Sequence, residues 1–385
     1  MANMRQRPKI PDQTQRELWA RAAGRCEFRG CNELLYRDGL TQHRSNLAII
    51  SHIVSFSPDG PRGDQIRSTQ LEKDIRNLIL TCRDHGKIVD DKALEAAYPE
   101  DLLQEFKREH EARVRMLTEI TADAQTHVLL LQASIDARDF EIDEQAAFRA
   151  ILPKYPAEES ARVIDLTGGR ASTETDGFFS MTAASISEQT RDLLRRRPGG
   201  RRITTLSVFA LAPVPLLVHF GHELGDIDHV DLYQRHRDGQ DWMWKAEEEA
   251  DEFYEVLCPE TADDGESAIA LVLSVSAPVG RDKITVALGR DAILYEIRAK
   301  DPSFDFLRSR KRLEVFGYEV RRLLTDLREA YGHDRMIHVF AATPAPVAIE
   351  FGRSIKDYDP PFLIYEYRKA DRLYVPALTV NCRSR

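Results

Sequence analysis

The spacing of apolar residues in the first third of the chain predicts a small mixed domain. Residues 13–23 have the pattern of a helix, and residues 48–53 and 77–81 are short apolar runs typical of strands. The Tyr98-Pro-Glu-Asp sequence begins a long charged stretch with apolar residues at helical spacing. We place the boundary of this domain at residue 121.

The pattern changes after Thr126. A strand-like HVLLLQASI is followed by a predicted helix over 144–151 and by the extended run VIDLTG. We interpret residues 122–170 as a linker or docking element, and residues 171–385 as a second domain.

The second domain contains an internal repeat. The sequence LSVFALAPVPLLVHFGHELGD begins at Leu206, and IHVFAATPAPVAIEFGRSIKD begins at Ile337, so that the two copies align over 21 positions without a gap and share residues such as Phe209/Phe340 and Gly221/Gly352. Each copy predicts a buried strand, a proline-containing turn, a helix and a further apolar strand, which is typical of a largely parallel sheet. We therefore expect two fused α/β units that face one another, with a ligand where strand ends meet helix starts. The alternative is a duplicated structural domain that binds no ligand.

Composition and charge narrow the classes of protein. The 385 residues are 42% hydrophobic, and they contain neither an apolar run long enough for a membrane span nor the apolar segment of a secretory signal. We therefore expect a cytoplasmic protein without a membrane partner, in which the five cysteines are reduced. Residues 1–89 carry a net charge of +5 and the remainder −14. This asymmetry allows a polyanionic partner at the N-terminal end only.

Two close pairs of soft ligands are separated by about 50 residues. They are Cys26-x4-Cys31 and Cys82-x2-His85. Four nitrogen and sulfur ligands in a reduced compartment predict a tetrahedral structural zinc ion. The alternative is that the thiols are ordinary buried side chains and that His85 lies on the surface.

The motifs around these pairs resemble a known family. NLAIISHIVSFSPDGPRGD lies between the pairs, RNLILTC contains Cys82, and IVDD follows His85. Over residues 15–110 this order resembles the HNH endonucleases, which have a zinc-stapled ββα-metal fold of the α+β class. The resemblance implies that His52 is the general base and that Asn77 orients the base and its loop. It also implies that Asp90 binds a catalytic divalent cation, Mg²⁺ or a similar ion.

The chain departs from the HNH pattern at two positions. Ser51 stands before the general base, where the family often has a metal-binding residue, and Gly86 stands where it often has histidine. These departures leave open a module without nuclease activity.

The second domain has its own resemblance. The stretch from Leu206 through QRHRDGQDWMW, with the repeat that ends in PPFLIYEYR, resembles SAVED domains, which consist of two fused CARF-like (Rossmann-like) α/β halves. This resemblance implies a sensor of cyclic oligonucleotides in CBASS anti-phage defence. Together the two resemblances imply a DNA endonuclease that stays silent until a cyclic dinucleotide or trinucleotide binds. It then forms a homo-oligomer and degrades double-stranded DNA.

A cyclic nucleotide needs aromatic faces for its bases and donors for its phosphates. The segment after the strand predicted at 230–233 supplies both, and further candidates lie at strand ends and turns. The predicted ligand-binding residues are Gln234, Arg235, His236, Trp242, Trp244, Lys245, Ser276, Thr343 and Pro344. The alternative for the tryptophans is a core pair beside a solvated charge run.

Two other functions compete with the ligand-gated nuclease. One is a constitutive HNH nuclease of the restriction type whose C-terminal half recognises DNA, although the charge of −14 on residues 90–385 argues against it. The other is a nuclease-dead nucleotide sensor that acts by assembly.

Overall fold

In the computed structural model the chain divides into two compact units, residues 1–121 and 122–385. The structure describes residues 7–135, 138–167, 177–195, 203–225, 227–239, 241–245, 248, 252–259 and 266–381. No helix within these ranges is both long enough and apolar enough to span a membrane.

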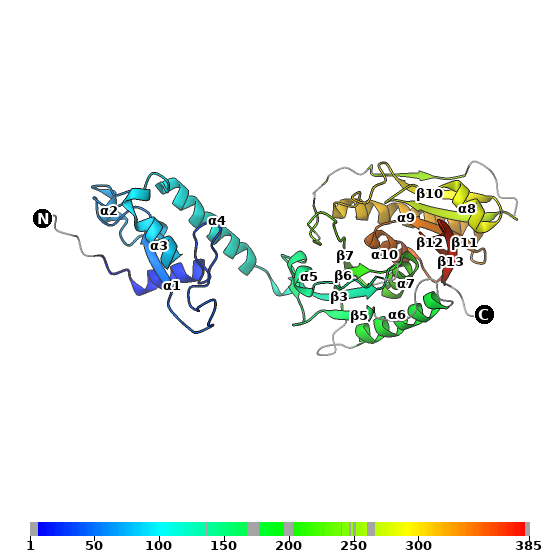
Figure 1. Cartoon of the computed structure of the whole chain (residues 1–385), viewed down its shortest axis with the longest axis horizontal. Helices are drawn as coiled ribbons and strands as arrows, with labels where there is room; N and C mark the ends of the chain where they lie inside the picture. Colours follow the sequence, from blue (N-terminus) through cyan, green and yellow to red (C-terminus); the bar gives the residue numbers. More distant parts are fainter. Residues whose placement is uncertain are drawn as a thin grey trace. The chain divides into compact units, whose positions relative to one another are not determined.

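The first unit consists of a two-stranded sheet surrounded by helices (Figure 1). The strands are antiparallel, with His52 opposite Leu78 at one end and Ala48 opposite Cys82 at the other. Its elements are α1 (Asp12–Arg21), β1 (Ala48–His52), α2 (Arg67–Gln70), β2 (Leu78–Cys82), α3 (Arg83–Asp90) and α4 (Glu100–Thr118). Strands and helices therefore occur where the apolar spacing predicts them, and α3 follows β2 directly.

The second unit contains two sheets, one in each repeat half. The first sheet has the order β4-β3-β6-β7, with β5 also paired to β3, and every pair in it is parallel. The elements of this half are β3 (Gln125–Ala133), α5 (Glu144–Ala150), β4 (Tyr155–Pro156), β5 (Arg162–Leu166), α6 (Phe178–Arg195), β6 (Thr205–Leu211), α7 (Val214–Leu224) and β7 (His229–Tyr233).

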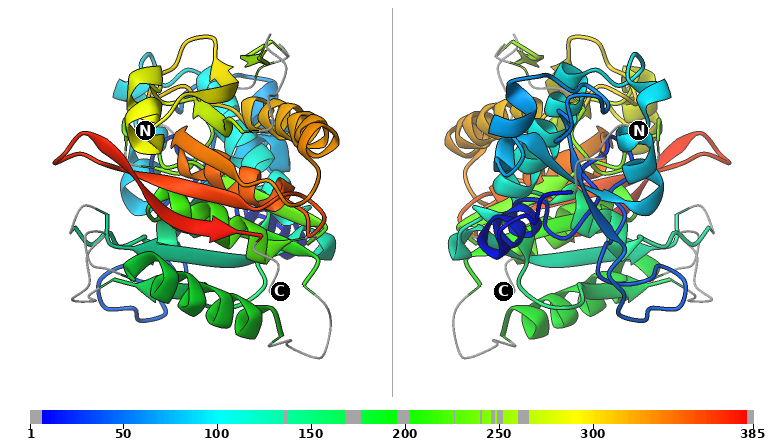
Figure 2. Two further views of the ribbon diagram at one scale, coloured as in Figure 1. Left: turned by 90° about the vertical axis from the view of Figure 1, so that its right-hand side faces the viewer. Right: turned by 90° about the vertical axis from the view of Figure 1, so that its left-hand side faces the viewer.

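The second sheet has the order β13-β12-β11-β9-β10-β8, with a parallel centre and an antiparallel strand at each edge. Strands β12 and β13 form a long twisted hairpin, drawn in orange-red and red in Figure 2. The elements of this half are β8 (Tyr254–Leu257), β9 (Ala268–Ser274), α8 (Arg281–Leu288), β10 (Ala292–Ala299), α9 (Arg310–Tyr331), β11 (Ile337–Ala342), α10 (Ala345–Ser354), β12 (Phe362–Arg368) and β13 (Leu373–Val380). The expectation of two α/β halves with largely parallel sheets is confirmed.

Residues 122–170 differ from the expected linker or docking element. β3 pairs with β6 over six residues, so that this segment belongs to the first sheet. Four consecutive buried apolar residues, Val128 to Leu131, explain the pairing, because such a run needs cover on both faces.

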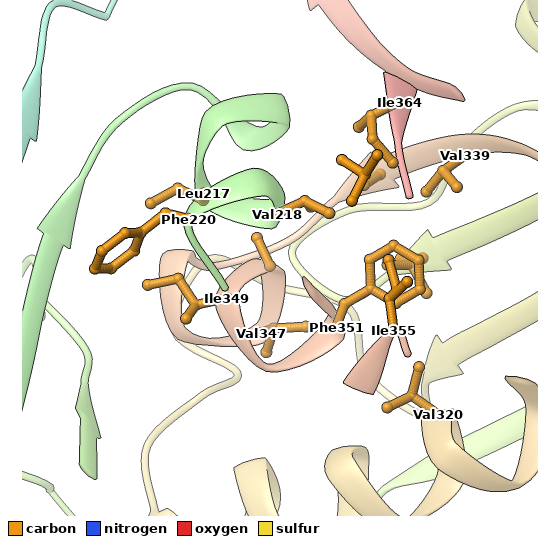
Figure 3. Packing of buried hydrophobic residues seen from close by; sticks show 14 of the residues in the cluster. Leu217, Val218, Phe220, Val320, Val339, Val347, Ile349, Phe351, Ile355 and Ile364 are labelled. Atoms are coloured by element: carbon orange, nitrogen blue, oxygen red, sulfur yellow. The ribbon is translucent and has the colours of Figure 1, made fainter. Parts of the chain in front are cut away.

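The two halves pack through helices α7 and α10, which lie side by side in the centre of the largest apolar cluster (Figure 3). The crossing reproduces the repeat symmetry. A Cβ atom on Gly221 would lie 2.1 Å from the carbonyl oxygen of Ile349, and one on Gly352 would lie 2.0 Å from that of Val218. Each contact is the other shifted by one repeat. Glycine at both positions therefore lets the helix backbones touch.

The aromatic residues follow the same symmetry. The rings of Phe209 and Tyr233 stack with their centroids 4.4 Å apart, and Trp242 packs edge-on against Phe209 at 5.2 Å. In the second half the ring of Phe340 stacks on that of Tyr365 with their centroids 4.4 Å apart, and Tyr374 packs edge-on against Phe340 at 5.2 Å. Each sheet therefore carries a cluster of three aromatic rings, centred on Phe209 in the first half and on Phe340 in the second.

Candidate functional site

The three cysteines and the histidine of the two predicted pairs come together in the first unit. Their ligand atoms all lie within 4.8 Å of one another, and no other such group occurs among the described residues. The Cys82 sulfur lies 3.1 Å, and the Cys26 sulfur 3.8 Å, from Nδ1 of His85. Tetrahedral zinc–thiolate geometry separates ligand atoms by about 3.8 Å, so the donor set fits zinc.

Local contacts hold the loop that contains Cys26 and Cys31. The backbone N–H of Glu27 donates to the carbonyl of Leu80 at 2.8 Å, and the Glu27 carboxylate accepts from the Leu80 N–H at 2.5 Å. Phe28 stacks on the His85 ring at 4.2 Å. Burial raises the pKa of the Cys26 and Cys82 thiols, and a coordinated cation would counter that effect because it favours thiolate. The loop is therefore fixed to β2 by groups that are not ligands themselves.

A cavity of about 290 Å³ adjoins the end of β1. His52, the last residue of β1, and Asp90, the last residue of α3, both line it. Arg7 lines it as well, together with the loop over residues 55–61. The strand pair and the following helix thus bring the predicted base and the predicted metal-binding carboxylate to one cavity.

The contacts of His52 favour the neutral imidazole. Its Nε2 lies 2.9 Å from the carbonyl oxygen of Glu72, so we assign the proton to Nε2, which leaves Nδ1 as the acceptor. Burial is the main cause that lowers the pKa of His52, and it raises the pKa of Asp90. A neutral imidazole beside a carboxylate is suited to take a proton from water.

Asn77 is buried and does not line this cavity. Its amide bridges two loops, because Oδ1 accepts from the Val54 N–H at 2.7 Å and Nδ2 donates to the carbonyls of Val54 at 2.9 Å and Leu71 at 3.2 Å. Asn77 therefore holds the chain that follows His52, and its role in orienting the base stays a prediction.

The two positions that depart from the HNH pattern, Ser51 and Gly86, are both buried. A Cβ on Gly86 would meet three side-chain atoms of Ile49 at 3.0 Å, because α3 packs closely on β1. Ser51 is fully buried. Asp90, the predicted ligand of a catalytic cation, lines the cavity together with His52.

A second cavity, of about 490 Å³, lies in the second unit where strands end and helices begin. Val214 of α7 and the segment after β7 line it from the first half. The second half contributes residues after β9 and β11 and from α8 and β12. A ligand here would contact both halves, as expected for fused α/β units.

This cavity combines cations, aromatic faces and unpaired acceptors. Nζ of Lys283 lies 3.1 Å from the hydroxyl of Tyr367 and 4.6 Å from the centre of its ring. The Arg237 guanidinium lies 4.1 Å from the Phe304 ring centre. Two buried oxygen atoms, Thr343 Oγ1 and Gln234 Oε1, have no hydrogen-bond partner among the described residues. Such atoms are costly unless a ligand or water pairs with them.

Five of the nine predicted ligand-binding residues line this cavity: Gln234, Arg235, Ser276, Thr343 and Pro344. The other four do not line it. His236 and Trp242 are 5% and 3% exposed, Trp244 packs against the main apolar cluster, and Lys245 forms a 2.7 Å ion pair with Asp241. For Trp242 this is a correction: its ring completes the aromatic cluster on Phe209 and is unavailable to a ligand.

The prediction missed Lys283, Tyr365 and Tyr367, which line the cavity. A signal for the tyrosines existed in PPFLIYEYR, because residues 365 and 367 are two apart on one strand and share a face. Lys283 lies on a separate helix without a recognisable motif.

The chain was compared with known proteins. No curated protein matches it. Among solved structures it is similar to the Cap4 SAVED/CARF-domain containing receptor of Acinetobacter baumannii with the cyclic trinucleotide 2′3′3′-cAAA. The identity is 13% and the TM-score 0.46, over 77% of this chain and 62% of that one. The Moraxella osloensis Cap4 receptor is 12% identical with a TM-score of 0.41, over 76% and 60% of the two chains. The chain spans about three fifths of the length of these receptors.

A family model gives the decisive comparison. The model of the SMODS-associated and fused to various effectors sensor domain, abbreviated SAVED, matches residues 186–380, just over half of the chain. The matched region runs from within α6 to the end of β13 and contains both copies of the repeat. The chain therefore belongs to the SAVED family of sensor domains.

Proposed function

We propose that the chain is a cyclic-oligonucleotide-activated, metal-dependent endonuclease that cuts double-stranded DNA as an antiviral effector of CBASS. One observation carries the nuclease half of the proposal. His52 and Asp90, from β1 and α3, line one cavity on the unit that also holds the Cys-His cluster. The family supports the other half, because SAVED domains are sensors that occur fused to effectors.

The chemistry proposed for the first unit is hydrolysis of a phosphodiester. Nδ1 of His52 takes a proton from water, the water oxygen attacks phosphorus, and one P–O ester bond breaks as its oxygen leaves with a proton from solvent. Asn77 holds the loop that follows the base. A divalent cation such as Mg²⁺, bound through Asp90, would supply charge stabilisation for the phosphate. Zinc held by Cys26, Cys31, Cys82 and His85 would be structural.

The second cavity is the proposed site for the cyclic dinucleotide or trinucleotide. Lys283 and Arg235 would bind phosphate, and the rings of Tyr367 and Phe304 would face bases. The unpaired oxygen of Thr343 would accept or donate one hydrogen bond to the ligand. Because the cavity contains residues from both halves, a bound ligand would favour one arrangement of the halves and, through it, a homo-oligomer.

The two competing functions make different predictions for one experiment. Purified protein is incubated with plasmid and Mg²⁺, with and without each member of a panel of cyclic oligonucleotides. We expect cutting only with one or a few of them, and light scattering should show a larger particle under the same conditions. Cutting without any nucleotide would favour the restriction-type nuclease. Binding and assembly without cutting would favour the nuclease-dead sensor, which Ser51 and Gly86 keep open.

A further inference from the structure

The segment before α1 forms a short arm that is fixed to the first unit. Ile10 is 7% exposed and packs in the apolar core of the unit. The Gln15 side chain donates to the Ile10 carbonyl at 2.8 Å. Pro8 and Pro11 flank this anchor and restrict the backbone on both sides of it. The buried Ile10 therefore fixes the arm to the first unit three residues after Arg7.

Arg7 extends from this arm to the cavity that His52 and Asp90 line. Its guanidinium donates to the carbonyl of Ile50, two residues before His52 on β1. The positive charge of Arg7 also acts to lower the pKa of both His52 and Asp90. Arg7 and Asp90 nevertheless form no salt bridge within 4.0 Å, although the structure describes both residues. The cation and the carboxylate thus line the same cavity and interact through their charges without a direct ion pair.

We infer that Arg7 binds the scissile phosphate of the DNA, a role that neither the HNH motif nor the SAVED family assigns to it. This inference rests on the proposed function. A guanidinium has five N–H donors in a planar fork, and the contact with Ile50 anchors the group while further donors remain to bind non-bridging phosphate oxygens. A fixed cation at this place would stabilise the charge that develops on phosphorus oxygens during attack.

The test compares DNA cleavage by the nucleotide-activated full chain and its Arg7→Ala and Arg7→Lys variants. The matched control is Lys9→Ala, an exposed cation on the same arm that does not line the cavity. Removing one preorganised donor lowers kcat by about 10²-fold or more, so we expect that loss in Arg7→Ala, a smaller loss in Arg7→Lys and none in Lys9→Ala. Millimolar guanidinium ion should restore part of the kcat of Arg7→Ala alone, a response that a structural role would not produce.

A second measurement needs no cleavage. Duplex DNA should bind more weakly, and with a smaller dependence on salt, when Arg7→Ala is added to His52→Ala. Cleavage by Arg7→Ala at the rate of Lys9→Ala would overturn the inference. Faster cleavage by Arg7→Ala without nucleotide would overturn it too, because the arm would then block the cavity. If His52→Ala alone abolishes cleavage while Arg7→Ala does not, the proposed function stands and only the Arg7 inference fails. If the parent protein never cuts DNA with any nucleotide, both the proposed function and the Arg7 inference are wrong.

Discussion

Replacing Gly221 by alanine tests the packing of the two repeat halves. The added Cβ would lie 2.1 Å from the Ile349 carbonyl oxygen, whereas an ordinary contact is about 3.4 Å. The obstacle is backbone of α10, so no side chain can rotate away and the helices must separate by about 1 Å. Overpacking of this kind costs about 3 kcal/mol. Alanine returns about 1 kcal/mol through its better helix propensity, which leaves a net loss of about 2 kcal/mol.

For a unit of this size, a loss of about 2 kcal/mol lowers Tm by roughly 4–8 °C. The assay is thermal unfolding of the full chain by calorimetry, in which the transition of the second unit is followed. Gly317→Ala is the matched control, because it is also a buried helical glycine. A Cβ there would meet only the ends of flexible side chains, Glu350 and Arg321. We expect this control to be neutral or slightly stabilising.

The symmetry of the crossing adds a second expectation. Gly352→Ala should cost about as much as Gly221→Ala, and the double variant should cost less than the sum, because the helices have already separated. Since Val214 of α7 lines the cavity proposed to bind the ligand, Gly221→Ala and Gly352→Ala should also bind a cyclic nucleotide more weakly. A Tm for Gly221→Ala equal to that of the parent would refute the reasoning.

Three further predictions concern the two sites. The purified chain should contain one zinc ion, and Cys82→Ser should lose both the zinc and the fold of the first unit, as measured by metal analysis and circular dichroism; a folded, zinc-free, active protein would contradict this. Because burial lowers the pKa of His52 below the ordinary value of histidine, about 6.5, the neutral base predominates above that pH, and cleavage should be lost as the pH falls below it; a half-maximal rate above pH 6.5 in the pH–rate profile would contradict the assignment. Thr343→Val should weaken cyclic-nucleotide binding about tenfold in calorimetric titration without lowering Tm, because it removes a buried hydroxyl that has no hydrogen-bond partner among the described residues; unchanged binding would place the ligand elsewhere.

Local pattern was sufficient to predict the elements of both repeat copies. Phe209 and Phe340 occupy the same position of β6 and β11, and Gly221 and Gly352 the same position of α7 and α10. Secondary structure predicted from one repeat copy can be tested against the other copy, because both form the same elements. The spacing in the sequence likewise predicted that the side chains of Cys26, Cys31, Cys82 and His85 would meet.

Long-range placement was harder to predict. The partner of β3 is β6, about 80 residues away, and no local feature of Val128–Leu131 names that partner. Trp242 lies among charged residues in the sequence, yet the chain turns back after β7 and buries its ring against Phe209. The position of Lys283 beside Tyr367 depends on how α8 packs, which no motif reports. In each case the missing information was tertiary contact rather than local preference.

Ligand-gated cleavage is tested by measuring DNA cleavage and nucleotide binding over the same range of nucleotide concentrations. The plasmid cleavage rate of the parent chain is recorded against the concentration of the activating cyclic oligonucleotide, beside the binding isotherm of His52→Ala for the same ligand. We expect His52→Ala to bind with the affinity of the parent and never to cut, and we expect the parent's cleavage to rise with nucleotide occupancy from a baseline near zero. Cleavage by the parent that is independent of the nucleotide, or cleavage by His52→Ala, would contradict this expectation.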